Sequence, residues 1–249
     1  MTARFHFAEK MEIADLEAML SAVRKRGTHG VILKARNTPR TAELAQGLMA
    51  LGIPVVTLVT DIAPQSRLAY VGIDNRVAGS NAAYLLGKMT PDRVKVLVSL
   101  SSRSFSGEED RAEGFSNLLK RDFPHLEIVR VSEGGGVHRS TYDLALAALA
   151  ANPELDCVYS IGGGNRAILQ AFADSARSCR ALVAHDLDAA NRDLLRQNRI
   201  TFLIHHDLRQ DARAACQWVL RHHRMLPADL DISPSRIMLL TPQDNLTGL

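Results

Sequence analysis

The sequence predicts an α/β protein built on parallel sheets. Short apolar runs alternate with longer segments in which apolar residues recur at helical spacing, and this alternation is typical of parallel α/β sheets. The chain has 249 residues, of which 46% are hydrophobic, so it can bury a large core without disulfides or metals. Its length alone is compatible with one large domain or two smaller ones.

The first series of elements extends to about residue 90. The predicted strands are the apolar runs at residues 4–7, 30–34 and 53–60, followed by a short strand that ends just before Asp74. The predicted helices cover residues 13–26 and 39–51 and a segment that begins beside Asn75. Pro39 suits the first turn of its helix, where an N–H group is not needed. The run at 53–60 is rich in Val, as buried parallel strands are.

The second series follows residues 90–92, and this joint suggests two Rossmann-like lobes. Its predicted strands lie at residues 94–99, 126–131, 157–161, 181–185 and 202–206, with a final strand within 233–240. Its predicted helices lie at residues 107–123, 140–152, 165–176, 189–197 and 208–224. Ser140 is expected to cap its helix, with Asp143 in the first turn.

Composition excludes several classes of protein. The 30 basic and 27 acidic residues leave a net charge of +3 that is scattered along the chain, which is weak evidence for nucleic-acid binding. Cys157, Cys179 and Cys216 are far apart and lie in apolar contexts, so a disulfide framework or a cysteine zinc site is not expected. Neither a signal peptide nor a membrane span is visible. These features predict a soluble, cytoplasmic protein.

The most distinctive stretch begins at Val71. It places Asp74 and Asn75 at the start of a helix, where Asn75 can cap the free N–H groups and Asp74 can interact with the helix dipole. Gly79, in the first turns, predicts close approach of another backbone. The pattern V-x-x-D-N-x-x-A-G-x-x-A resembles the signature of the effector-binding domain of the lac repressor family of bacterial regulators, which shares its fold with periplasmic sugar-binding proteins.

This resemblance implies a fold of two Rossmann-like lobes joined by a multi-crossover hinge, the type I periplasmic-binding-protein arrangement. The first lobe would comprise residues 1–90 and about 208–230, and the second residues 91–207 and about 231–249. The resemblance also implies a ligand cleft between the lobes and a homodimer, with Ala78, Ala82 and Leu86 near the first-lobe interface. The alternative is that these small residues cover the sheet of their own chain.

Two charged residues match the family's ligand-binding positions. Residues 109–115 resemble the motif R-x-x-G-F, whose arginine, here Arg111, grips sugar hydroxyls or a carboxylate. The alternative for Arg111 is a surface ion pair with Glu108 or Glu109. Residues 183–188 resemble a strand end in which the first aspartate, here Asp186, accepts hydrogen bonds from ligand hydroxyls, while Asp188 caps the next helix.

The chain also departs from the family. Gly163 and Gly164 stand where the family has Asn-Asp, so contacts there would come from backbone N–H groups or from Asn165. A phosphate cradle at this helix start is a weaker alternative. The family normally begins with a helix-turn-helix, and nothing before Phe5 supplies one, so the chain itself is not expected to read DNA bases.

Other chemistries are less favoured. His185, Asp186, His205, His206 and Asp207 lie at two strand ends and could form a metal site, although polar residues lining a sugar cleft are the more common arrangement. Because His205 and His206 alternate on a strand, only one of them can face the cleft. Ser160 lacks the context of a nucleophile elbow.

The sequence therefore predicts the effector domain of a regulator, binding a sugar or sugar-like cyclitol and controlling DNA binding by a separate N-terminal domain. The alternatives are a sugar-binding protein of an ABC transporter and, third, an α/β enzyme. No catalytic residue, cofactor or metal is expected. The predicted ligand-binding residues, with Phe105, His185 and His206 as candidate stacking surfaces, are Arg111, Asp186, Asn165, His185, His206 and Phe105.

Overall fold

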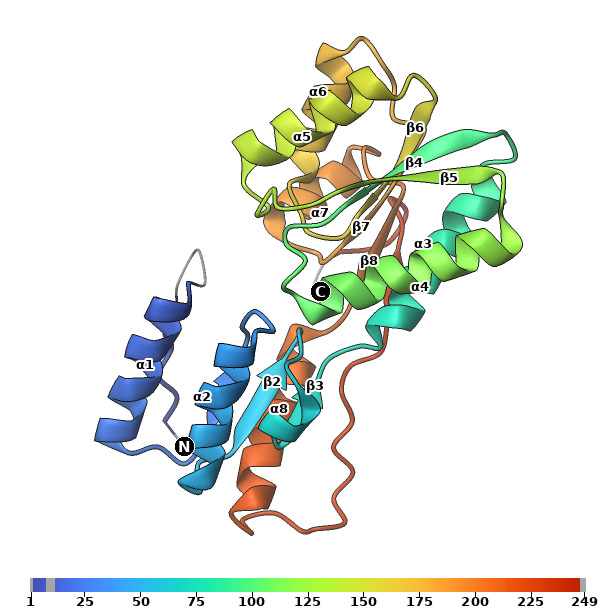
Figure 1. The fold of residues 1–249 in the computed structure, drawn as a ribbon. Helices are drawn as coiled ribbons and strands as arrows, with labels where there is room; N and C mark the ends of the chain where they lie inside the picture. Colours follow the sequence, from blue (N-terminus) through green and yellow to red (C-terminus); the bar gives the residue numbers. More distant parts are fainter. Residues whose placement is uncertain (1, 8–11, 247–249) are drawn as a thin grey trace. The chain divides into compact units, whose positions relative to one another are not determined.

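The computed structural model describes residues 2–7 and 12–246, and the chain forms two compact units (Figure 1). The first unit comprises residues 1–72, 104–106 and 208–235, and the second comprises residues 73–103, 107–207 and 236–249. The chain therefore divides after Gly72 and not near residue 90 as the sequence predicted. The difference lies in the helix that follows Gly72, whose apolar face belongs to the core of the second unit.

The first unit holds a three-stranded parallel sheet in the order β1-β2-β3. Its elements are α1 (Ile13–Arg26), β1 (Val31–Leu33), α2 (Pro39–Ala50), β2 (Val55–Leu58), the 3-10 turn η1 (Pro64–Ser66), β3 (Ala69–Val71) and α8 (Leu208–His222). Apolar residues of α1 and α2 form one core with β1 and β2, and α8 packs with β2 and β3 in another. The sheet is thus covered on both faces.

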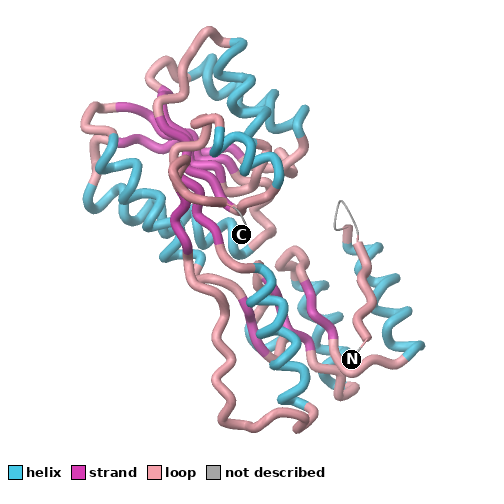
Figure 2. Tube along the Cα trace, turned by 180° about the vertical axis from the view of Figure 1, so that it is seen from behind, coloured by secondary structure: helices cyan, strands magenta, loops and turns pink. Residues whose placement is uncertain are grey.

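The second unit holds a six-stranded sheet in the order β5-β4-β6-β7-β8-β9, in which only β9 is antiparallel. Figure 2 shows these strands with helices on both faces. Helices α3 and α4 form one core with the sheet, and α5, α6 and α7 form the other. The elements are α3 (Asn75–Met89), β4 (Val94–Ser99), α4 (Ser106–Asp122), β5 (Leu126–Val131), α5 (His138–Ala151), β6 (Leu155–Ser160), α6 (Asn165–Asp174), β7 (Ala181–His185), α7 (Ala189–Arg196), β8 (Phe202–His205) and β9 (Met238–Leu240).

The α/β class and the two lobes are confirmed, and most predicted elements fall within a few residues of the observed ones. The predicted strand at residues 4–7 is wrong, because residues 2–7 form neither helix nor strand. A strand requires a neighbour to receive its backbone hydrogen bonds, and β1 pairs only with β2 in the described part of the chain. None of the described helices is long and apolar enough to cross a membrane.

Two predicted helix caps are also corrected. Asp74, and not Asn75, caps α3, because its carboxylate accepts a hydrogen bond from the Val77 N–H at 3.0 Å. Ser140 lies inside α5, which begins two residues earlier, and its hydroxyl donates to the Gly134 carbonyl. The predicted Asp188 cap of α7 is confirmed by the bond from the Asn191 N–H at 2.7 Å.

Helices α3 and α4 cross at two glycines. A Cβ atom on Gly79 would lie 1.9 Å from the Arg111 carbonyl oxygen, and one on Gly114 would lie 2.1 Å from the Arg76 carbonyl oxygen. Both distances are far below contact, so only glycine permits the backbones to approach this closely. The Ser80 hydroxyl spans the same crossing and lies 3.3 Å from the Gly114 carbonyl oxygen. The close approach that Gly79 predicted is therefore present within the chain.

The small-residue stripe of α3 faces its own chain. Ala78, Ala82 and Leu86 have no exposed surface and lie in the core that α3 forms with the six-stranded sheet. The predicted place for these residues in a dimer interface is therefore wrong, because a fully buried side chain has no surface left for a partner.

The glycine crossing predicts a large and selective cost of added volume. Gly79→Ala should lower the free energy of unfolding by at least about 2 kcal/mol, because the new methyl group meets backbone that cannot rotate away. Gly47→Ala in α2 is the matched control: nothing lies within 4 Å of its Cβ position, so it should stabilise the protein by about 0.5–1 kcal/mol. Urea denaturation followed by circular dichroism measures both, and equal effects of the two changes would contradict this account of the crossing.

Candidate functional site

Polar residues gather at the carboxyl end of the six-stranded sheet. Strands β6, β7 and β8 are neighbours and run parallel, so the residues that follow them meet at one edge. Asn165 begins α6 after β6, His185 ends β7 and is followed by Asp186, and His206 follows β8. Arg111 reaches the same group from α4, since its charge acts on both His185 and Asp186.

Arg111 is buried, with 4% of its surface exposed. Its Nε–H donates a hydrogen bond to the Asn75 Oδ1 atom at 2.7 Å. Within the part of the chain that the structure describes, its two terminal amino groups make no hydrogen bond. A guanidinium carries five N–H donors, so four of the five remain for another acceptor.

The alternative of a surface ion pair for Arg111 is wrong. Glu108 accepts hydrogen bonds from the backbone N–H and the hydroxyl of Ser101, at 2.7 and 2.5 Å. Burial raises the pKa of Glu108, although these hydrogen bonds oppose the rise. Glu109 instead pairs with Arg130 at 2.6 Å. Neither carboxylate forms an ion pair with Arg111, although the positive charge of Arg111 also opposes the rise in the pKa of Glu108.

Asp186 presents a carboxylate at the end of β7. Its φ angle of 67° is left-handed, a conformation that aspartate tolerates better than most side chains. Its Oδ1 atom lies 3.5 Å from Nε2 of the buried His206, while the side chain as a whole is 43% exposed. Burial alone would raise the pKa of Asp186, but the His206 ring and the charge of Arg111 outweigh it and lower the pKa. The carboxylate therefore stays ionised at neutral pH and can accept hydrogen bonds.

His185 is held in the neutral form. Burial, and then the nearby positive charge of Arg111, lower the pKa of this imidazole well below its ordinary value. Its Nε2 atom is hydrogen-bonded to the Tyr159 hydroxyl at 2.8 Å, and Tyr159 stacks on Phe115 with 4.6 Å between ring centroids. The Nδ1 atom is buried without a partner among the described residues.

A chain of amides joins β7 to α6. The Asn191 amide donates to the carbonyl oxygens of His185 and Asp186, at 2.9 and 2.8 Å, so its own oxygen faces the other way. That oxygen accepts from Asn165 Nδ2 at 2.6 Å. The orientation of Asn165 is thereby fixed, and its Oδ1 is a buried acceptor without a partner among the described residues.

Gly163 and Gly164 lead into α6 with left-handed φ angles of 84° and 75°. Gly164 occupies the cap position of α6, where no side chain bonds to the free N–H groups. A Cβ atom on Gly163 would have nothing within 4 Å, so the backbone here borders open space. Backbone N–H groups therefore stand where the family's polar pair was expected.

The structure does not support the predicted stacking role of Phe105, His185 and His206. Phe105 belongs to the first unit, where its ring lies under the Arg36 guanidinium. His185 and His206 are 5% and 1% exposed, so neither ring offers a free face. His205 accepts a hydrogen bond from the Leu187 N–H. Among the described residues no group of His, Cys, Asp or Glu is arranged to hold a metal, so the metal alternative gains no support.

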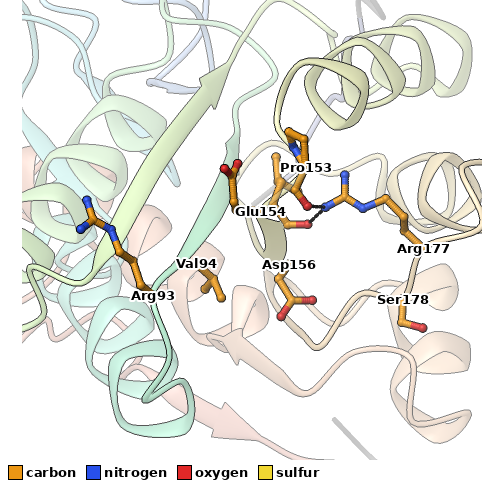
Figure 3. A pocket seen from close by; sticks show the side chains of 8 residues that line it. Arg93, Val94, Pro153, Glu154, Asp156, Arg177 and Ser178 are labelled. Atoms are coloured by element: carbon orange, nitrogen blue, oxygen red, sulfur yellow. Dashed lines mark hydrogen bonds between the residues drawn. The ribbon is translucent and has the colours of Figure 1, made fainter.

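A separate pocket of about 330 Å³ lies at the amino end of the same sheet, beside Val94 and Leu155 (Figure 3). Its charged groups already have partners within the chain. Arg177 donates to the carbonyl oxygens of Pro153 and Leu155, as the dashed lines in Figure 3 show, and Arg93 pairs with Glu127. The pocket therefore offers little to a ligand, whereas the carboxyl end of the sheet holds buried polar atoms without partners among the described residues, on Asn165 and His185.

Sequence reasoning missed three residues that organise this end of the sheet. Asn75 was interpreted as a cap, Tyr159 as a strand residue, and Asn191 received no role. One indication of this arrangement was present in the sequence, Tyr159 within the apolar run of β6, because a buried tyrosine hydroxyl requires a hydrogen-bond partner. Asn75 bonds to Arg111, 36 residues away in sequence, and Asn191 bonds to Asn165, 26 residues away.

Comparison with known proteins decides the family. The periplasmic binding protein domain family matches residues 7–224 of the chain. The chain belongs to this family. No curated protein sequence matches it.

Solved structures of the same fold cover more than nine-tenths of the chain at low sequence identity. The glucose-galactose binding protein GanP of Geobacillus stearothermophilus is 19% identical, with a TM-score of 0.84 over 94% of this chain and 83% of its own. A solute-binding protein of an ABC transporter from Agrobacterium vitis, solved with bound D-fucose, is 16% identical, with a TM-score of 0.85 over 96% and 83%. A protein from Bacteroides fragilis that is described as a putative LacI transcriptional regulator is 18% identical, with a TM-score of 0.76 over 94% of this chain and 82% of its own.

Because His185 is neutral in the folded state, we expect the stability of this member of the periplasmic binding protein family to depend on pH. Because the folded state lowers the pKa of His185, the unfolded state takes up a proton first as pH falls below about 6.5. The contribution of His185 to the free energy of unfolding is fully present above that pH. It is lost as the pH falls further, by up to about 1.4 kcal/mol per pH unit. The pKa of His205 is also lowered, so removing His185 should reduce the slope without abolishing it.

Urea denaturation between pH 7.5 and 5 measures this slope. The double variant Tyr159→Phe/His185→Phe removes both ends of the buried hydrogen bond and should reduce the slope, leaving the part that His205 contributes. His138→Gln, at an exposed histidine of the same unit, is the control and should leave the slope unchanged. An unchanged slope in the double variant would show that His185 is not the group that takes up the proton.

Proposed function

We propose that this chain binds a small polyhydroxylated molecule, a monosaccharide or a cyclitol, at the carboxyl end of its six-stranded sheet. The observation that carries the proposal is the set of unused polar groups at that end. Four N–H donors of Arg111, the ionised Asp186 and the buried Asn165 Oδ1 stand on neighbouring elements. Sugar hydroxyls both donate and accept, so they match such a mixed set.

The family and the neighbouring structures support this class of ligand. GanP is described as a glucose-galactose binding protein, and the Agrobacterium vitis protein holds D-fucose. The polar groups of this chain stand at the strand ends where open α/β sheets bind ligands. Binding without turnover is part of the proposal, since none of the groups described here forms an arrangement typical of a nucleophile and its base.

The favoured biological setting is the sugar-binding component of a transporter, because sugar-binding and transporter proteins are frequent among the similar structures. A regulator's effector domain is the second candidate. Its support is the V-x-x-D-N signature together with the similarity to the Bacteroides fragilis regulator. Intact mass of the protein isolated from its native cells separates the two. A polypeptide that carries a helix-turn-helix favours the regulator, and one trimmed of an export signal favours the transporter.

Titration calorimetry with D-glucose, D-galactose, D-fucose, arabinose and fructose tests the ligand class. At least one sugar should bind, and Arg111→Ala or Asp186→Asn should weaken it at least tenfold. A hydrogen bond to a charged group contributes roughly 1.5–3 kcal/mol, and 1.4 kcal/mol is a factor of about ten. Asparagine accepts the left-handed φ angle at position 186, so that change removes charge without straining the backbone.

The matched controls are Arg166→Ala and Asp193→Asn, which remove an exposed ion pair between α6 and α7. Both should bind the sugar as the unaltered protein does. The proposal fails if none of the sugars binds, or if the Arg111 and Asp186 variants bind as tightly as the controls.

A further inference from the structure

Asn75 contacts the one donor of Arg111 that is already used. Its Oδ1 atom accepts the Nε–H at 2.7 Å, and both residues are buried, Asn75 being 7% exposed. The capping role that the sequence predicted for Asn75 is taken by Asp74. We propose that Asn75 is a positioning residue that fixes the plane of the Arg111 guanidinium, an inference that rests on the proposed sugar site.

The helix crossing fixes the backbone of Arg111 independently of Asn75. Its carbonyl oxygen lies against Gly79, at the place where a Cβ atom would be 1.9 Å away. Gly114 lies against the Arg76 carbonyl in the same way, one turn further along α4. Helix α4 therefore has a fixed position on α3, and the remaining freedom of Arg111 is in its long side chain.

A single bond to Nε is enough to remove most of that freedom. The guanidinium is planar, so fixing Nε–H also fixes the directions of the two terminal amino groups. Together with burial, the positive charge of Arg111 lowers the pKa of His185, and it opposes the rise that burial gives to the pKa of Tyr159, whose ring stacks on Phe115. Preorganised donors lose less entropy when a ligand binds.

The acceptor is neutral, and the carboxylates of α4 that could have taken its place are otherwise engaged. Arg76 pairs with Asp110 and Glu113, at 2.8 and 2.6 Å, and Glu108 accepts from Ser101. A neutral amide orients Arg111 without cancelling its charge. The positive charge of Arg111, which also opposes the rise that burial gives to the pKa of Glu108, thus remains to act on Asp186 and on a bound hydroxyl.

The first test reads the Arg111 Nε–H directly by NMR of 15N-labelled protein, with the signal assigned by its loss in Arg111→Lys. In the unaltered protein this signal should exchange slowly with water, because the proton is buried and bonded. Asn75→Ala should speed the exchange at least tenfold, and Asn75→Asp, which keeps the acceptor oxygen, should restore slow exchange. Asn81→Ala, at an exposed asparagine of the same helix, is the control. Slow exchange in Asn75→Ala would overturn the proposal.

The second test repeats the calorimetry with the same five sugars. Asn75→Ala should raise the Kd of the sugar that binds at least fivefold, while Asn81→Ala leaves it unchanged. If Asn75→Ala does not fold, Asn75→Gln replaces it, since the longer arm displaces the acceptor and should still weaken binding and speed the exchange. Equal Kd values for Asn75→Ala and Asn81→Ala would overturn the positioning role.

The two tests also separate this inference from the proposed function. If no sugar binds the unaltered protein, the proposed function fails, and the exchange rate of the Arg111 Nε–H still decides whether Asn75 orients the guanidinium.

Discussion

The second unit depends on the close crossing of α3 and α4. Gly79 and Gly114 each lie against a carbonyl oxygen of the other helix, so the two backbones fit together in one register only. That register buries Ala78, Ala82 and Leu86 against the sheet and brings Asn75 within 2.7 Å of Arg111. The same contact thus builds part of the core and places the charged group of the candidate site. This explains why small residues are spaced along α3, where larger ones would bury more area.

Burial decides which groups of the candidate site carry charge. His185 is surrounded on all sides and lies near Arg111, so its pKa falls and it remains neutral. Asp186 is also partly buried, but favourable contacts with His206 and Arg111 lower its pKa and keep it ionised. The result is one guanidinium, one carboxylate and several neutral polar atoms. This set suits hydroxyl groups, which need both donors and acceptors and bring no charge of their own.

The sequence was a good guide to features with local causes. Alternation of apolar runs and helical segments predicted the class, and the motifs around Arg111 and Asp186 placed both residues correctly at the start of a helix and the end of a strand. It failed where the cause is a distant partner. Residues 4–7 alternate like a strand, but none of the described strands pairs with them. Phe105 follows β4 in sequence, yet its ring lies under Arg36 in the first unit. Asn75 has the chemistry of a cap, and only the crossing of α3 with α4 reveals that its oxygen bonds to Arg111.

The role of asparagine explains how the site combines rigidity with unused charge. Asn75 holds Arg111, and Asn191 holds both the end of β7 and the Asn165 amide. A carboxylate at position 75 would make a stronger bond to Arg111, but it would also neutralise the charge of that residue. A carboxylate at position 191 would repel Asp186. An amide offers a donor and an acceptor in fixed directions at no net charge. Because both amides are buried among packed helices, their directions are set by the fold, and the charges of Arg111 and Asp186 remain available to the proposed ligand.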